Sequence, residues 1–227
     1  MTTRRPVKAV GPQLVAVISS ADDFEAAMAL KQPPDLFELR LDCLVPITSR
    51  LEKKISRLRA PLIITARDPR EGGANKLSLA VRRELLLRFL PRARYVDMEL
   101  RSAREFESLL AQAQKRKVGR IWSYHNFKST PSSRSLCAKA KRAKAIGVEV
   151  FKVATRTDNP AALARLVDFM TNKDSNLRVS AMGIGKLGGI SRLFLARCGS
   201  ALNYAAITRA NVEGQLSIDV LRSALPR

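Results

Sequence analysis

Residues 119–171 read GRIWSYHNFKSTPSSRSLCAKAKRAKAIGVEVFKVATRTDNPAALARLVDFMT, and this stretch decides the fold class. Two runs within it, 119–127 and 148–155, are rich in β-branched and aromatic residues and predict strands. The segment between them and the segment 160–171 have the apolar spacing of amphipathic helices. Strands and helices that alternate in this way are typical of parallel strands joined by right-handed crossovers.

The same alternation extends to both ends of the chain. Six further strands are predicted, at 14–20, 35–41, 60–67, 95–100, 177–183 and 201–207, and further helices include 103–117 and 215–225. Helix start signals stand at Ser20, at Pro131 and at Asn159-Pro160. Eight such units of about 28 residues each favour a closed barrel. We therefore expect an α/β fold, a single (β/α)8 TIM barrel over 14–227, after a mobile basic lead-in over 1–13.

Composition indicates an ordinary folded protein. Hydrophobic residues make up 46% of the 227 residues and charged residues 27%, which excludes a disordered or fibrous chain. No apolar run approaches the roughly 18 residues that cross a bilayer, and the first residues do not resemble a secretory signal, so we expect a cytoplasmic protein. Three scattered cysteines and a single histidine provide no cluster of metal ligands.

Net charge is the unusual bulk property. Lys and Arg number 41 against 20 Asp and Glu, a balance of +21 that favours anionic partners such as nucleic acid, acidic lipid or a small metabolite. The basic residues lie inside predicted helices, at 53–59, 82–83, 115–117 and 139–144. We interpret them as solvated outer faces, with nucleic-acid contact as the alternative.

Polar and charged residues share one face of the predicted strands. Side chains alternate between the two faces of a strand, so residue parity sorts each strand into two rows. One row is apolar and suits packing against helices. The other points into the barrel and contains Glu38, Arg40, Asp42, Thr65, Arg67, Asp97, Glu99, Ser123, His125, Lys152, Ser180 and Met182. Ionised groups inside a core are costly unless paired, so this row predicts a site at the carboxyl ends of the strands.

Lys152 is the most informative residue of this row. Its row neighbours are Val150 and Ala154, and an apolar setting favours the neutral amine that attacks a carbonyl carbon. His125 lies one predicted strand earlier, and adjacent strands are about 4.8 Å apart. An amine that forms an imine and an imidazole that moves a proton suit a reaction at the carbon next to a ketone.

Two loops carry further candidates. Glu71, in the segment RDPREGG after the third strand, can orient a histidine, although an ordinary turn is the alternative. Arg40, Arg67 and Arg192 offer bidentate recognition of carboxylate or phosphate, which favours an anionic substrate. The glycine-rich segment 182–192, MGIGKLGGISR, is either a mobile lid or a loop that cradles an anion.

Eight motifs follow one another along the chain: Glu38–Asp42, Thr65–Arg67 with Glu71–Gly73, Asp97–Glu99, Ser123–Phe127, Phe151–Ala154, Ser191–Arg192, Gly199–Ser200 and Gly214–Gln215. In order and spacing they resemble the type I 3-dehydroquinate dehydratases. The resemblance covers residues 14 to 225.

The resemblance implies a lyase of the shikimate pathway that needs no cofactor and removes water from 3-dehydroquinate to give 3-dehydroshikimate. It implies that Lys152 forms a Schiff base with the substrate ketone, that His125 moves the protons and that Glu71 assists His125. It places Glu38, Arg40, Arg67, Arg192 and Gln215 in contact with the substrate, with Arg192 as the carboxylate clamp. It also implies a homodimer with no nucleic-acid or membrane partner.

Three alternatives remain open at this stage. A class I aldolase would share the barrel and the lysine but would cleave a carbon–carbon bond. An inactive barrel with a binding role would keep the fold and form no covalent adduct. A nucleic-acid-binding protein would use the basic surface and would not depend on Lys152.

Overall fold

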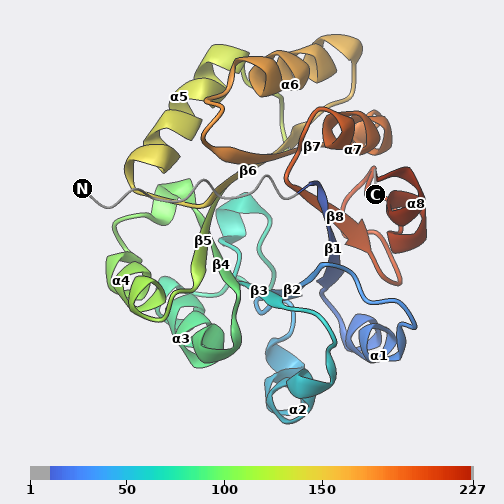
Figure 1. Cartoon of the computed structure of the whole chain (residues 1–227). Helices are drawn as coiled ribbons and strands as arrows, with labels where there is room; N and C mark the ends of the chain where they lie inside the picture. Colours follow the sequence, from blue (N-terminus) through green and yellow to red (C-terminus); the bar gives the residue numbers. More distant parts are fainter. Residues whose placement is uncertain (1–10, 226–227) are drawn as a thin grey trace.

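In the computed structural model, which describes residues 11–225, eight parallel strands alternate with eight α-helices that form a ring around them (Figure 1). The strands are β1 (Gln13–Ile18), β2 (Leu36–Arg40), β3 (Leu62–Thr65), β4 (Tyr95–Glu99), β5 (Gly119–Asn126), β6 (Val150–Arg156), β7 (Arg178–Ile184) and β8 (Leu202–Ala206). The helices are α1 (Ala21–Ala29), α2 (Thr48–Lys54), α3 (Leu79–Phe89), α4 (Glu107–Lys115), α5 (Ser133–Ala145), α6 (Pro160–Asn172), α7 (Gly188–Arg197) and α8 (Ile218–Ala224).

The predicted fold class is confirmed. Every predicted strand is present, with its ends shifted by two residues at most. The lead-in predicted over 1–13 falls mostly outside the described residues, and β1 already includes residue 13. None of the helices within residues 11–225 is long and apolar enough to cross a membrane.

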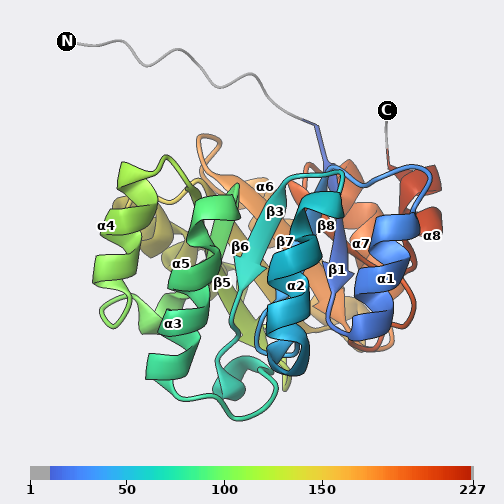
Figure 2. The same ribbon diagram turned by 90° about the horizontal axis from the view of Figure 1, so that it is seen from below.

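The barrel is nearly closed. Its strands pair in the order β7-β6-β5-β4-β3-β2-β1-β8, and the arrowheads of β1 and β3 point to the same edge in Figure 2. Between β7 and β8, Ala201 N donates to Val179 O at 2.8 Å. The Ser200 hydroxyl accepts from Ala181 N at 3.0 Å and donates to Ala181 O at 3.2 Å. Side-chain hydroxyls thus help to close the seam that the main chain leaves open.

Helix starts follow local capping chemistry. The side chains of Ser20 and Asn159 accept hydrogen bonds from the first turns of α1 and α6, as their sequence positions predict. Pro131 stands two residues before α5, whose cap is Ser132. Each cap is the last residue of the loop between a strand and the next helix. It therefore sets where that loop ends at the mouth of the barrel.

The core has an outer and an inner layer. Two apolar clusters fill the space between the strands and the helical ring, one around β1–β4 and the other around β5–β7. A third cluster lies inside the barrel and includes Val15, Ile63, Ile121, Val150 and Tyr204. These residues form an apolar floor beneath the charged residues.

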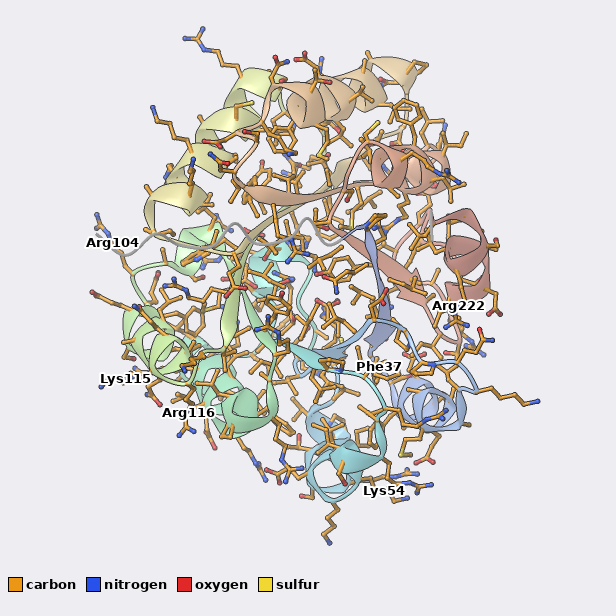
Figure 3. The ribbon with its side chains drawn as sticks, in the orientation of Figure 1. Phe37, Lys54, Arg104, Lys115, Arg116 and Arg222 are labelled. Carbon is orange, nitrogen blue, oxygen red and sulfur yellow. The ribbon has the colours of Figure 1, made fainter. Side chains whose placement is uncertain are left out.

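Basic side chains lie mainly on the outer rim. The labelled Lys54, Arg104, Lys115 and Arg116 extend outward from the helical ring in Figure 3. The interpretation of the basic residues as outer faces is wrong for Arg82, which is 2% exposed. Arg82 is buried because Asp68, after β3, and Glu99, on β4, present carboxylates to the inner side of α3.

Candidate active site

A cavity of about 320 Å³, called the main cavity below, opens at the carboxyl ends of the strands. It is lined by all eight residues that the sequence analysis selected: Glu38, Arg40, Arg67, Glu71, His125, Lys152, Arg192 and Gln215. They come from β2, from the segment after β3, from β5 and β6, from α7 and from the loop after β8. Parallel strands bring these distant positions to one end of the barrel.

Lys152 lies in the middle of β6 and is 4% exposed. Its Nζ donates to Glu38 Oε1 at 3.1 Å and to Asp97 Oδ2 at 3.0 Å. It also lies 3.8 Å from the centroid of the Tyr204 ring. The apolar setting that the sequence predicts for Lys152 is correct for its stem but wrong for its amine. The two carboxylates hold the amine in one position at the base of the main cavity.

His125 occupies the same inward face one strand away. In the register of β5 and β6, Ser123 pairs with Lys152 and His125 pairs with Ala154, so the imidazole lies one step nearer the mouth than the lysine. His125 Nδ1 lies 3.1 Å from Glu71 Oε2, which also accepts from the His125 backbone N at 3.0 Å. Nε2 has no protein hydrogen-bond partner within residues 11–225.

Burial sets the protonation of this pair. It lowers the pKa of His125 well below its usual value, and the charges of Arg67 and Lys152 lower it further. Burial also raises the pKa of Glu71 to about 7. The imidazole is therefore neutral near pH 7 and can accept a proton.

The short helix at Pro69–Glu71 positions Glu71. Asp68 caps this helix by accepting from Arg70 N, and Gly72 ends it with φ +83°. A Cβ at position 72 would come within 2.7 Å of the Phe127 ring. The turn therefore favours glycine for its backbone angle, and the tip of the Phe127 ring, just after β5, lies close to this position.

Arg67 is the centre of a buried ion network. It contacts Asp97 at 2.9 Å and Glu99 at 3.1 Å. Arg82 binds the other oxygen of Glu99 and contacts Asp68 at 3.1 Å. These pairs neutralise most of the charge that the strands carry into the barrel, and they hold Asp97 in contact with the lysine.

Arg192 is bound differently from the other two candidate arginines. Arg40 is paired with Asp42 at 2.8 Å, and Arg67 with its two carboxylates. Arg192 is 4% exposed and donates only to Tyr204 O at 3.0 Å and to Met182 Sδ at 3.5 Å; its buried Nε has no partner. Burial lowers its pKa to about 10. Within residues 11–225, its guanidinium therefore has a charge that no carboxylate balances.

The loop after β8 forms one rim of the main cavity. Gln215 Oε1 accepts from Asn211 N at 2.7 Å, and the Asn211 side chain contacts the Ser19 hydroxyl at the end of β1. Asn211, Val212 and Gln215 all line the cavity. This loop is in contact with strand ends on both sides, which places Gln215 at the mouth.

Four amides of the glycine-rich segment 182–192 are not free to cradle an anion. The N–H groups of residues 185–188 donate to Glu213 O, Asp158 Oδ1, Thr157 O and Gly185 O at 2.8–3.0 Å. Because these four amides already have acceptors, they do not bind phosphate. The choice between a mobile lid and an anion loop for the whole segment stays a prediction.

The fold and the main cavity define a class: a (β/α)8 enzyme with its site at the carboxyl ends of the strands, built around a buried lysine and a histidine. The family model for type I 3-dehydroquinase matches residues 14–226. The chain belongs to the type I 3-dehydroquinase family.

Individual relatives agree with this assignment. The 3-dehydroquinate dehydratase of Shouchella clausii is 34% identical over 241 residues, which cover 99% of this chain and 92% of the relative. That of Methanothermobacter thermautotrophicus is 32% identical over 201 residues, or 88% of each chain. The structure of 3-dehydroquinate dehydratase from Geobacillus kaustophilus has a TM-score of 0.84 at 27% identity, covering 94% of this chain and 90% of that one.

Proposed function

We propose that this chain removes water from 3-dehydroquinate to give 3-dehydroshikimate, through an imine between Lys152 and the substrate ketone. The observation that carries the proposal is that one cavity holds the Lys152 amine, the His125 imidazole and the unbalanced Arg192 guanidinium. Membership of the type I 3-dehydroquinase family supports the choice of substrate.

Lys152 supplies the electron sink. The Lys152 ammonium releases one proton, the amine adds to the ketone carbon, and a second proton passes from nitrogen to the former carbonyl oxygen. The released proton then returns to that oxygen, which leaves as water, and a protonated imine forms. This iminium has the same charge as the lysine ammonium that it replaces. Glu38 and Asp97, which lie 3.1 Å and 3.0 Å from Nζ, are therefore paired with a cation both before and after the step.

His125 moves the protons. The iminium acidifies the neighbouring C–H, and the neutral imidazole takes that proton through Nε2. The resulting enamine returns its electron pair and expels the hydroxyl on the next carbon, which leaves as water with the proton from His125. Water then hydrolyses the product imine and frees the lysine. Glu71, 3.1 Å from Nδ1, stabilises the imidazolium that forms between the two proton transfers.

Arg192 orients the substrate. It is the clamp for the substrate carboxylate because no carboxylate within residues 11–225 balances its guanidinium. Glu38, Arg40 and Arg67 also line the main cavity, and in the proposal they contact the substrate while the two arginines stay bound to their own carboxylates. Gln215 lies at the mouth of the main cavity and closes it above the six-membered ring of the substrate.

Borohydride reduction with 3-dehydroquinate tests the lysine. We expect a stable adduct on Lys152, located by mass spectrometry of peptides, and neither adduct nor turnover in Lys152→Ala. Lys186→Ala is the matched control, because Lys186 is exposed and lies two residues after Ile184, which lines the main cavity, and it should still form the adduct. An adduct on another residue, or no adduct in an active preparation, would contradict the proposal.

His125→Ala tests the proton transfer separately. Loss of a general acid and base lowers turnover by about 10²–10⁴-fold. The lysine is still present, so borohydride should continue to trap some adduct. Full activity in this variant would remove His125 from the mechanism.

We also propose, from the family resemblance, that the chain acts in the shikimate pathway in the cytoplasm and forms a homodimer. Sedimentation velocity of the purified chain measures the assembly directly. A monomer at micromolar concentration would contradict the homodimer.

A further inference from the structure

A second cavity lies behind the wall formed by Glu71 and His125. Its volume is about 440 Å³, and both of these residues line it as well as the main cavity. The other lining residues come from the segments after β3, β4 and β5 and from α5, which packs beside β5 and β6 (Figure 1). One wall is therefore shared by two separate spaces.

This second space, called the basic cavity below, is lined by five cationic side chains: Arg70, Arg101, Lys128, Lys139 and Arg142. Among the described residues that line it, Glu71 is the single carboxylate. Such a set of like charges around one hollow raises its electrostatic potential and attracts an anion.

Most of these cations have no strong partner. Arg70 is paired with Asp68 at 2.8 Å, but Arg101 approaches Glu71 no closer than 4.0 Å. For Lys128, Lys139 and Arg142, no carboxylate lies within 4.0 Å in the part of the chain that the structure describes. Their charge is therefore available to a ligand.

Two of these cations lie together on α5. Lys139 and Arg142 are three residues apart and so share one helix face, where like charges repel each other. Lys139 Nζ lies 4.7 Å from the centroid of the Tyr124 ring, which also lines the basic cavity. An anion between them would relieve the repulsion and accept hydrogen bonds from both.

We propose that the basic cavity binds a small polyanion through phosphate or carboxylate groups, with Lys139, Arg142 and Arg101 as its main contacts. The ligand is small because the cavity volume is about 440 Å³. It carries more than one negative charge because several cations converge there. Planar guanidinium groups and ammonium groups both suit phosphate and carboxylate oxygens.

Isothermal titration calorimetry of the full chain tests the site. Inorganic pyrophosphate and citrate are titrated separately, and the tighter of the two identifies the anionic group preferred. We expect saturable binding to the wild type and a dissociation constant raised by about tenfold or more in Lys139→Gln/Arg142→Gln. Thermal unfolding confirms that the variant is folded, and Lys139→Arg/Arg142→Lys, which keeps both charges, should retain binding.

Arg134→Gln/Lys141→Gln is the matched control. It removes the same charge from the same helix, but neither residue lines the basic cavity. It should bind both anions as the wild type does. Equal binding by both double glutamine variants would assign the anion to diffuse surface charge or to the main cavity and overturn the proposal, as would the absence of saturable binding.

A bound anion would also act on the shared wall. It would compete with Glu71 for Arg101, and the loss of this cation weakens the support that Glu71 gives to His125. This consequence rests on the proposed function.

Pyrophosphate should lower kcat at saturating 3-dehydroquinate in the wild type but not in Lys139→Gln/Arg142→Gln. Calorimetry does not depend on turnover, so an inactive chain that binds pyrophosphate would contradict the proposed function alone. An unchanged kcat in an active chain that binds pyrophosphate would contradict the coupling alone.

Discussion

The two sides of the main cavity bury charge in opposite ways. On the side of β3 and β4, Arg67 is bound to Asp97 and Glu99, and Arg82 to Glu99 and Asp68. On the side of β7 and β8, the buried Arg192 is bound by a backbone carbonyl and a sulfur atom and by no other group within residues 11–225.

The difference separates structural charge from ligand-binding charge. A buried ion pair holds its partners in one geometry, and removal of one partner leaves an uncompensated charge. A buried guanidinium without a carboxylate partner costs solvation free energy in the empty protein and regains it when an anion binds. Burial alone therefore does not indicate which role an arginine has, whereas its partners do.

The largest effect on stability is expected for Arg67→Met. This change leaves Asp97 and Glu99 buried without their main counter-ion, and the free energy of unfolding should fall by about 3–5 kcal/mol. Urea unfolding followed by circular dichroism measures the change. Arg88→Gln, which breaks an exposed pair with Glu52, is the control and should change stability little. A stable Arg67→Met variant would remove the structural role assigned to the ion network.

Arg192→Met should change substrate binding strongly and stability little, the opposite of Arg67→Met. Its free energy of unfolding should change by less than about 1.5 kcal/mol, since no buried carboxylate loses a partner. The loss of a charged hydrogen bond to the substrate should raise KM for 3-dehydroquinate by about 10–100-fold. Steady-state kinetics and urea unfolding measure the two effects. If this variant unfolds as readily as Arg67→Met, the contrast between the two sides is wrong.

Glu71→Gln should alter the pH profile. The pKa of Glu71 is raised to about 7, so in the wild type its carboxyl ionises as pH rises through neutrality, while His125, with its lowered pKa, is already neutral. Since the ionised carboxylate supports the imidazolium best, kcat/KM should rise about tenfold between about pH 6 and about pH 8. Glutamine does not titrate, so the rise should be absent in the variant. A rise that persists in Glu71→Gln would assign it to another group.

The smallest effect is expected at the seam between β7 and β8. Ser200→Ala removes two hydrogen bonds to Ala181 and should lower the free energy of unfolding by about 1–2 kcal/mol without changing kcat. Ser223→Ala removes an exposed hydroxyl bond on α8 and serves as the control. A kcat that falls together with stability in Ser200→Ala would mean that the seam also positions the active site.

Strand parity predicted much of the site from sequence. A period of two residues and the parallel order of the strands are local properties, and together they direct Glu38, His125 and Lys152 to one end of the barrel. Parity does not tell how far along the barrel axis a residue lies relative to residues on strands that are not its neighbours. The contact of Lys152 with Glu38, from β2 across the barrel, therefore required the structure.

One sequence interpretation was wrong because the partners of the residue lie elsewhere in the chain. Arg82 has the local pattern of a solvated helical arginine, and its burial depends on the carboxylates of Asp68, after β3, and Glu99, on β4, beneath α3. The glycines of 182–192 have the pattern of an anion loop, and only the structure shows that acceptors from residues 157, 158, 185 and 213 occupy the amides of residues 185–188. The basic cavity was not predicted because its cations come from four separate segments.

The sequence by itself determined the eight-fold alternation of strands and helices, the inward row of charged residues and the pairing of one lysine with one histidine, because hydrophobic period and residue type are local quantities. Only the tertiary structure decided which buried charges neutralise each other, which arginine is left for an anion and that two cavities share the wall of Glu71 and His125. The reason is that electrostatic interactions depend on distances of a few ångströms between side chains from different strands, and those distances are determined by the closure and packing of the whole barrel.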